Sequence, residues 1–313
     1  MKILLLGADG QVGFELQRSL AVLGPLKLAT RSGTRFGDGD CLTADLGDPD
    51  ALQALIRAEA PDWIVNAAAY TAVDQAEVEP ALAQRINAEA LAAIGAAARA
   101  TRARVLHFSS DYVFAGNATV PWRETDPTAP LGAYGRSKCA GEQALRDSGA
   151  EHLILRTAWV FAARGHNFLR TMLRLADTLD RISVVDDQIG SPTTAALIAD
   201  ISAHLLAQLR GAPADDPRFG TYHLTASGQT SWHGFARALL QSAVDAKLLR
   251  ALPELVAIAS ADYPTRAARP AWSVLDTHKL QNTFALHLPH WQEGMTTVIR
   301  QLADAAARDA SPD

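Results

Sequence analysis

The sequence predicts an α/β protein with a Rossmann-type doubly wound parallel sheet and a smaller C-terminal α/β lobe. In the first half of the chain, short β-branched or leucine-rich runs alternate with longer amphipathic stretches rich in Ala and Leu, which is the pattern of βαβ units. Gly7, Gly10 and Gly13, three residues apart, stand where the first strand turns into the first helix. After about residue 160 the alternation loosens and Pro, Trp and His become more frequent, which indicates a different second part.

The elements of this fold follow in order along the chain. Asp48 before Pro49 is typical of an N-cap followed by proline at the first helical position. Strands are predicted at residues 2–6, 26–29, 63–66, 105–108 and 152–155, and helices at residues 12–23, 49–59, 79–100 and 133–148.

Composition excludes several classes of protein. The chain of 313 residues carries 29 Lys and Arg against 34 Asp and Glu, a net charge of -5 that offers no electrostatic footprint for nucleic acid. The two cysteines, Cys41 and Cys139, belong to no Cys/His cluster, so neither a disulfide framework nor a zinc site is indicated. The apolar opening at residues 3–6 is too short for a signal peptide or a membrane span. We therefore expect a cytoplasmic protein without a membrane or nucleic-acid partner.

The glycine loop predicts a dinucleotide site. Gly7 permits the tight turn, Gly10 lets a pyrophosphate approach the backbone, and Gly13 lets the helix pack close to the strand. The helix N-terminus favours the phosphate charge, and Gln11 and Val12 complete the set of predicted ligands. The alternative is a purely structural turn, because a glycine triplet alone is weak evidence.

The end of the second strand bears on the choice of cofactor. NAD is usually held there by an Asp or Glu that pairs with the ribose hydroxyls, whereas this chain has Ala29-Thr30-Arg31-Ser32. A cationic end suits a 2′-phosphate, so Arg31 predicts NADPH, with NADH as the second choice. The alternative is that Arg31 is only a solvated loop charge.

Two further segments are candidates for contacts with the same cofactor. Asp45 and Leu46 follow a short apolar stretch and are placed to meet the adenine; alternatively, Asp45 merely starts a helical turn. Small residues after the strand at 63–66 would let a cofactor lie against the backbone, although close packing explains the same run. The residues concerned are Ala68, Ala69, Tyr70 and Thr71.

The pair Tyr134 and Lys138 predicts acid-base chemistry. Positions four apart project from the same face of a helix. A free tyrosine titrates near ~10, and an ammonium beside it favours the phenolate, so the pair can exchange a proton with a carbonyl or alcohol. The alternative is an exposed pair on a surface helix. Ser110 favours the first interpretation, because it ends an apolar strand at the carboxyl edge where open α/β sheets bind ligands, and its hydroxyl can bond the reacting oxygen.

Together these elements resemble the extended short-chain dehydrogenase/reductases. Six segments resemble the dTDP-4-dehydrorhamnose reductase family more narrowly, in order along essentially the whole chain. They are NAAAYTAVDQAE (66–77), SSDYVFAG (109–116), YGRSKCAGE (134–142), RTAWVF (156–161), DDQIGSPT (186–193) and YPTRAARPAWSVLD (263–276). Members of this family reduce the 4-keto group of dTDP-4-dehydro-β-L-rhamnose to give dTDP-β-L-rhamnose, the last step in making this activated sugar.

The resemblance implies catalytic roles and a division of labour. It makes Tyr134 the proton donor, Lys138 its partner and nicotinamide-ribose ligand, and Ser110 the hydroxyl of the triad, where the family more often has threonine. Serine retains the hydrogen bond. Residues 1–160 would form the NAD(P)-binding Rossmann domain. Residues 161–313 would form mainly the substrate-binding lobe, with some segments returning to the Rossmann domain.

The resemblance also implies substrate contacts. Ser110, Asp111 and Trp159 would contact the sugar, with Trp159 as a flat apolar face; alternatively, Trp159 is a core residue. Asn167 and Arg269 are candidates for the dTDP pyrophosphate, Arg269 because its fork matches phosphate oxygens. The alternative for Arg269 is a surface ion pair.

One departure from the family concerns a metal. Some members are described as binding Mg²⁺ between two subunits through a glutamate on the first helix and another after the SPT segment. Glu15 matches the first, but the later stretch reads Thr193-Thr194-Ala195-Ala196 and lacks the second acid. Since a hard cation needs several oxygen ligands, we expect no metal, and a monomer or weak homodimer.

Two rival functions stay open from the sequence. A non-catalytic regulatory subunit of the methionine adenosyltransferase type shares the superfamily, but it has no need of an intact Ser110, Tyr134 and Lys138. A sugar-nucleotide epimerase or dehydratase is the other. Dehydratases usually carry an Asp-Glu pair after the triad hydroxyl, whereas Asp111-Tyr112 follows here. Net consumption of NADPH would separate an epimerase from a reductase.

Overall fold

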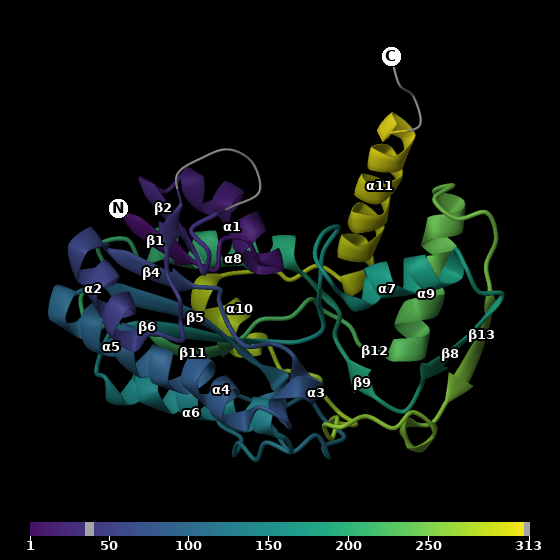
Figure 1. Ribbon diagram of the computed structural model, residues 1–313, viewed down its shortest axis with the longest axis horizontal. Coiled ribbons are helices and arrows are strands. Elements are labelled where there is room, and N and C mark those ends of the chain that lie inside the picture. The colour runs from purple at the N-terminus through teal and green to yellow at the C-terminus, as the bar shows by residue number, and fades with distance from the viewer. Residues whose placement is uncertain (35–40, 310–313) are drawn as a thin grey trace.

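A seven-stranded parallel sheet forms the centre of the computed structural model, which describes residues 1–34 and 41–309 (Figure 1). The strand order is β11–β6–β5–β4–β1–β2–β3. The strands are β1 (Ile3–Leu6), β2 (Leu26–Thr30), β3 (Leu42–Thr43), β4 (Trp63–Asn66), β5 (Arg104–Ser110), β6 (His152–Thr157) and β11 (Gly220–His223). The order reverses between β1 and β4, where open α/β sheets bind ligands at the carboxyl ends of their strands. The predicted fold class is confirmed.

The burial of each strand explains whether it can be predicted from the sequence. β1 and β4 are buried along their whole length, so each reads as a continuous apolar run, and all five predicted strands are confirmed. β3 and β11 are not among the predictions. β3 has only two residues, and β11 begins with a glycine and is only half buried, so neither carries an apolar run.

Helices cover both faces of the sheet. α1 (Gln11–Ala21) packs against α8 (Ala195–Gln208) on one face, where α10 (His278–Phe284) also contributes to the core. The other face carries α2 (Pro49–Glu59), α5 (Ala90–Thr101) and α6 (Ala133–Asp147). Asp48 Oδ1 accepts a hydrogen bond from the Ala51 N–H at 3.0 Å, which confirms the predicted N-cap of α2.

The helix predicted at residues 79–100 differs in detail. It consists of α4 (Pro80–Gln84), a π-helical turn η1 (Arg85–Glu89) and α5 in direct succession. A π turn inserts an extra residue into the helix and is frequent at functional sites, but the composition of the stretch does not reveal it. The short helix α3 (Val73–Ala76) precedes α4.

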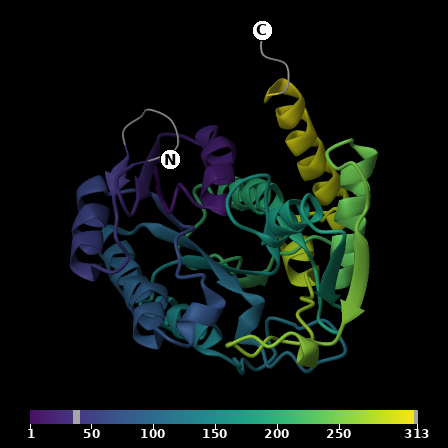
Figure 2. The same ribbon diagram turned by 45° about the vertical axis from the view of Figure 1, so that its right-hand side comes forward.

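A second, smaller body lies beside the sheet, and the two views agree on this separation (Figures 1 and 2). Its apolar core includes Phe161, Leu169, Phe235 and Met295. Its helices are α7 (Phe168–Ala176), α9 (Trp232–Asp245) and α11 (Trp291–Asp309). Its strand pairs are β7 (Val160–Phe161) with β10 (Thr193–Thr194), β9 (Ile189–Gly190) with β12 (Thr230–Ser231), and β8 (Arg181–Val185) with β13 (Glu254–Ile258). Two 3-10 turns, η2 (Asp111–Val113) and η3 (Ser260–Asp262), complete the elements.

Three elements after residue 160 return to the main sheet. β11 pairs with β6, while α8 and α10 cover one face. Across residues 1–34 and 41–309, no helix is both long enough and apolar enough to cross a membrane.

Candidate active site

Tyr134 and Lys138 lie one turn apart on α6, which packs on the sheet. α6 begins at Ala133, whose N–H donates to Glu77 Oε1 at 2.6 Å. Lys138 is only 2% exposed, and Glu142, one further turn along, is completely buried. The spacing of four therefore aligns Tyr134, Lys138 and Glu142 on one stripe of the helix.

Ser110 ends β5 next to Tyr134. Its hydroxyl donates to Asp111 Oδ1 at 2.8 Å and accepts from the Tyr112 N–H at 3.2 Å. The Ser110 hydroxyl is close enough to the Tyr134 phenol to lower its pKa, and the rings of Tyr112 and Tyr134 meet edge to face, with centroids 5.6 Å apart. Two hydroxyls thus converge at the carboxyl end of β5, as the sequence predicts.

The protonation of Tyr134 differs from the expectation. Burial raises the pKa of Tyr134 well above its ordinary value, against the lowering by the nearby Ser110 hydroxyl. Lys138 does not supply the expected lowering, because its amine is engaged elsewhere: Nζ donates to the Phe108 carbonyl at 2.7 Å and lies 3.1 Å from His107 Nε2. Tyr134 is therefore a protonated phenol at neutral pH, the form that a proton donor requires.

Asp111 is a buried acid beside these hydroxyls. It is 3% exposed, and its Oδ2 has no hydrogen-bond partner among the described residues. Burial raises the pKa of Asp111 from its ordinary value to about 6, against the nearby hydroxyls of Ser273 and Ser110, which lower it. Asp111 thus presents a buried acceptor oxygen close to Ser110 and Tyr134.

The glycine loop has the geometry that a dinucleotide needs. A Cβ at Gly13 would lie 2.0 Å from the Gly7 carbonyl oxygen, so α1 packs here only because position 13 is glycine. The only close atom to a Cβ at Gly10 would be at 3.4 Å, which leaves room on that side. Among the described residues no side chain caps α1, and its first turn contains no acidic residue, so no side-chain acceptor is bonded to its first N–H groups. These features fit a pyrophosphate.

Comparison with known proteins gives one consistent result. A family profile described as the RmlD substrate binding domain matches residues 1–304. The dTDP-4-dehydrorhamnose reductase of Escherichia coli strain K12 is 46% identical, over 98% of this chain and 100% of the relative. The chain belongs to the dTDP-4-dehydrorhamnose reductase family.

Other family members agree. The dTDP-4-dehydrorhamnose reductase of Burkholderia thailandensis is 47% identical, over 96% of this chain and 99% of the relative. The crystal structure of dTDP-4-dehydrorhamnose reductase from Bacillus anthracis in complex with NADP is 30% identical, with a TM-score of 0.83 over 96% of this chain and 99% of that one. The resemblance seen in the sequence is confirmed.

The remaining cofactor candidates differ in their surroundings. Arg31 is exposed at the end of β2. Asp45 is exposed and its Oδ1 accepts from the Gly47 N–H at 2.8 Å, which is a local turn, while Leu46 packs in the core below α2. The stretch after β4 is partly exposed from Ala68 to Tyr70, and Thr71 is exposed.

Asn87 lies between Tyr70 and Ser137 and is not among the residues that the sequence predicts. Its Oδ1 accepts from the Tyr70 N–H at 2.9 Å, and its Nδ2 donates to the Tyr70 carbonyl at 3.0 Å and to Ser137 Oγ at 2.9 Å. A Cβ at Gly141 would lie 2.0 Å from the Asn87 carbonyl oxygen. The π turn η1 thus ties the segment after β4 to the helix α6, and no sequence pattern signals it.

Trp159 has an unusual backbone. Its φ of +50° is rare for a large side chain. The indole stacks on Trp232 with centroids 3.5 Å apart and planes 5° apart, and a Cβ at Gly190 would lie 2.4 Å from it. The side chain is partly buried, so the structure holds one face of the indole against the smaller body.

The two pyrophosphate candidates have partners within the protein. Asn167 caps α7 and donates to Gln11 Oε1 at 2.7 Å and to the Ala162 carbonyl at 2.9 Å. Arg269 donates to Asp74 at 2.6 Å and to the Tyr112 hydroxyl at 3.2 Å. Asn167 therefore joins the glycine loop to the smaller body, and Arg269 joins the segment after β13 to the active-site turn η2.

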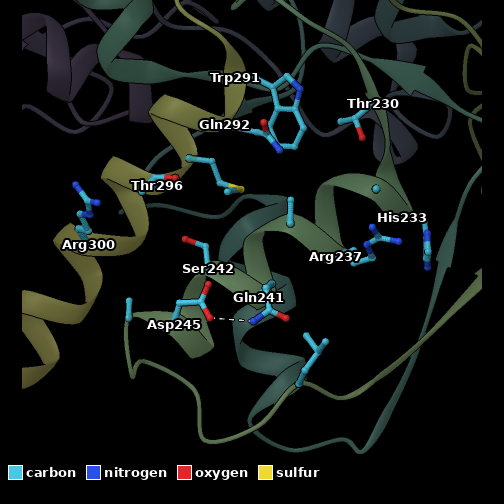
Figure 3. Close-up of a pocket in the computed structure, with 15 residues that line it drawn as sticks. Thr230, His233, Arg237, Gln241, Ser242, Asp245, Trp291, Gln292, Thr296 and Arg300 are labelled. Carbon is cyan, nitrogen blue, oxygen red and sulfur yellow. Dashed lines mark hydrogen bonds between the residues drawn. The ribbon is translucent and has the colours of Figure 1, made fainter.

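A separate cavity of about 1150 Å³ lies between α9 and α11 on the smaller body (Figure 3). Arg237 on α9 and Arg300 on α11 line it, and Gln241 donates to Asp245 along its floor at 2.9 Å. It contains none of the predicted site residues, so the cavity and the proposed chemistry occupy different parts of the molecule.

The two positions considered for a metal, Glu15 and the stretch at residues 193–196, lie on α1 and across β10 and the start of α8. Glu15 is partly exposed on α1, and Thr194 caps α8 by accepting from the Leu197 N–H at 3.2 Å. Within the described ranges, no group of three or more His, Cys, Asp and Glu side chains is arranged to hold a metal ion.

Proposed function

We propose that this protein reduces the C4 keto group of dTDP-4-dehydro-β-L-rhamnose with NADPH to give dTDP-β-L-rhamnose, the last step of dTDP-rhamnose biosynthesis. The observation that carries the proposal is a protonated Tyr134 beside Ser110 at the carboxyl end of β5, in a chain 46% identical to a reductase of that name. A cytoplasmic location suits this role.

The chain's own residues supply the proton and its placement. Reduction of a ketone adds a hydride to carbon and a proton to oxygen, and NADPH supplies the hydride when bound. Tyr134 donates the proton, since burial keeps its phenol protonated until charge develops on the substrate oxygen. Ser110 bonds the same oxygen and orients it. Lys138, anchored to the Phe108 carbonyl, would hold the nicotinamide ribose.

The end of β2 fits NADPH better than NADH. Arg31 is exposed there and offers a fork to the 2′-phosphate. The pyrophosphate would lie on the first turn of α1. The adenine and nicotinamide sides would be bounded by Asp45 and Leu46 and by the stretch after β4. The proposed cofactor ligands are Gly7, Gly10, Gln11, Val12, Gly13, Arg31, Asp45, Leu46, Ala68, Ala69, Tyr70, Thr71, Tyr134 and Lys138.

The sugar nucleotide would lie between the sheet and residues 161–313. Asp111 offers its unpartnered Oδ2 to a sugar hydroxyl, and Trp159 offers an indole face. Arg269 would bind the pyrophosphate by giving up its ion pair with Asp74 for contacts with phosphate oxygens. Asn167 would also contact the pyrophosphate. These assignments would make residues 1–160 the cofactor-binding part and residues 161–313 mainly the substrate-binding part.

Neither rival function is favoured. A regulatory subunit has no use for a buried lysine and a protonated tyrosine beside a serine. An epimerase returns its nicotinamide unchanged, whereas a reductase consumes NADPH. We further propose a monomer or weak homodimer without bound Mg²⁺.

The test is to mix the protein with NADPH and dTDP-4-dehydrorhamnose and to follow the absorbance of reduced nicotinamide. Wild type should consume NADPH in proportion to substrate, and Tyr134→Phe should not. Tyr263→Phe is a matched control, because Tyr263 is 59% exposed. Absence of oxidation by wild type, or full activity of Tyr134→Phe, would sink the assignment.

A further inference from the structure

Lys138 is held by two neighbouring residues of one strand. Its Nζ donates to the Phe108 carbonyl at 2.7 Å and lies 3.1 Å from Nε2 of His107, and both partners belong to β5, close before Ser110. His107 is 1% exposed. Neither the family comparison nor the proposed function assigns His107 a role.

The imidazole of His107 is neutral. Burial holds the pKa of His107 well below its ordinary value, and the Lys138 charge lowers it further. A neutral imidazole has one N–H and one acceptor nitrogen, whereas an ammonium has only donors. If Lys138 is charged, Nε2 of His107 must be the acceptor and the ring hydrogen must sit on Nδ1.

Nδ1 faces Asn66 at the end of the neighbouring strand. It lies 3.2 Å from Nδ2 of Asn66, which can only donate, while Oδ1 of Asn66 accepts from the Ala68 N–H at 3.1 Å. The parallel register places Asn66 directly beside His107. With the ring hydrogen on Nδ1, the Asn66 amide must turn its oxygen toward Nδ1 to accept this hydrogen, and the ring is then held by β4 through Nδ1 and by α6 through Nε2.

We propose that His107 is a positioning residue for Lys138: it accepts a hydrogen bond from the ammonium and so fixes both the place and the charge of the lysine beside Tyr134. This rests on the proposed function, because that function gives Lys138 its task. The chemistry requires an acceptor here, since a buried ammonium left with one carbonyl would lose its proton more readily.

The other charges around Lys138 do not replace this acceptor. Glu142 favours the ammonium, but both of its oxygens accept from Arg156, at 2.9 and 2.7 Å. Besides His107, the titratable groups on elements packed against α6 are Asp74 of α3, Arg85 and Glu89 of η1, Arg99 of α5, Arg104 of β5, Asp111 and Tyr112 of η2, and His152 and Arg156 of β6. On α6 itself they are Tyr134, Arg136, Cys139, Glu142, Arg146 and Asp147.

The first experiment is the pH profile of kcat for NADPH oxidation in His107→Phe, His107→Gln and wild type. Burial lowers the pKa of Lys138 to about 8, so loss of its charge should set the alkaline limb. In His107→Phe that limb should move to lower pH by about one unit or more, because hydrogen bonds to charged groups are strong. His107→Gln keeps an acceptor near the place of Nε2 and should stay close to wild type. His152→Gln, a partly buried histidine of β6 bonded at the Ala150 carbonyl, is the matched control.

The second experiment needs no activity. Lysine side-chain shifts in the full-length protein, with Lys138 assigned through Lys138→Met, should show its titration midpoint falling in His107→Phe. The ¹⁵N shifts of His107 in wild type, assigned through their absence in His107→Gln, should show the neutral Nδ1–H form. An unmoved Lys138 midpoint, or an Nε2–H form while Lys138 is charged, would overturn the proposal. If His107→Phe does not fold, the tautomer of His107 in wild type and the titration midpoint of Lys138 in His107→Gln still test the proposal. A wild type that ignores the sugar substrate would refute the proposed function alone.

Discussion

Ser110 donates a 2.8 Å hydrogen bond to one carboxylate oxygen of Asp111, while the other oxygen of the same carboxylate has no partner among the described residues. A buried acid with one unpartnered oxygen is costly to the fold and useful to a ligand, because it offers an acceptor to a substrate hydroxyl. The ionised carboxylate of Asp111 should therefore lower the stability of the fold while it contributes to activity.

Asp111→Asn should stabilise the protein at neutral pH. The pKa of Asp111 is raised from 3.8 to about 6 in the fold. A raised pKa means that the contribution to stability is complete below the ordinary pKa and is lost as pH rises through about 6. The loss is at most about 3 kcal/mol for a shift of this size. Denaturant unfolding at pH 4.5 and at pH 8 should show the variant gaining on wild type as pH rises, with lower reductase activity. An equal difference at both pH values would contradict this.

Tyr134→Phe should lose kcat by about 10²- to 10⁴-fold, the range of a lost general acid. The fold should persist, because the ring keeps its edge contact with Tyr112 at 5.6 Å. The KM for NADPH should change little, since the hydroxyl acts on the substrate oxygen. Steady-state kinetics and a thermal melt separate loss of chemistry from loss of fold. A variant that melts early with unchanged kcat would rule out the acid role.

The sequence predicts those parts of the site that depend on local spacing. Tyr134 and Lys138 share a helix face by number alone, and Ser110 is found because an apolar strand ends there. Asn87 escapes prediction because a π turn changes the helix phase without changing composition. His107 escapes because its role depends on the register of β5 against β4 and on the packing of α6.

The same reasoning accounts for the protonation of Tyr134. A lysine four residues away predicts a lowered pKa, but the direction is set by how much water reaches the phenol, and that is a property of the assembled fold. The ion pair of Arg269 with Asp74 joins residues 195 positions apart, so the sequence alone left Arg269 between a phosphate ligand and an ion-pair partner.

Arg31→Ala should weaken NADPH more than NADH. Arg31 is exposed at the end of β2, so its removal should not disturb the fold. If its guanidinium pairs with the 2′-phosphate, the KM for NADPH should rise by roughly ten-fold, the size of one charge-assisted contact, while the KM for NADH stays the same. Kinetics with both cofactors at one ionic strength test this. An equal change for both would mean that Arg31 is only a solvated charge.

Glu142→Gln should destabilise the protein strongly. Glu142 is completely buried and pairs with Arg156, which is itself 4% exposed. Breaking a buried pair leaves an uncompensated charge, at a cost of about 3–5 kcal/mol. Glu254→Gln is the matched control, because its pair with Arg181 is 65% exposed on both sides and should contribute under about 1 kcal/mol. Denaturant unfolding of both variants gives the comparison, and a similar small loss in each would show that the buried pair is not needed.

Removal of divalent metal should leave the state of association unchanged. Glu15 lies on α1, but the stretch around β10 and the start of α8 provides Thr194, Ala195 and Ala196 rather than a second acid. A hard cation held by one carboxylate would keep most of its water and could not join two subunits firmly. Sedimentation velocity with EDTA and with added Mg²⁺ should give the same monomer or weak homodimer, and Glu15→Gln should behave as wild type. A dimer that dissociates with EDTA and re-forms with Mg²⁺ would mean that other oxygen ligands complete the site.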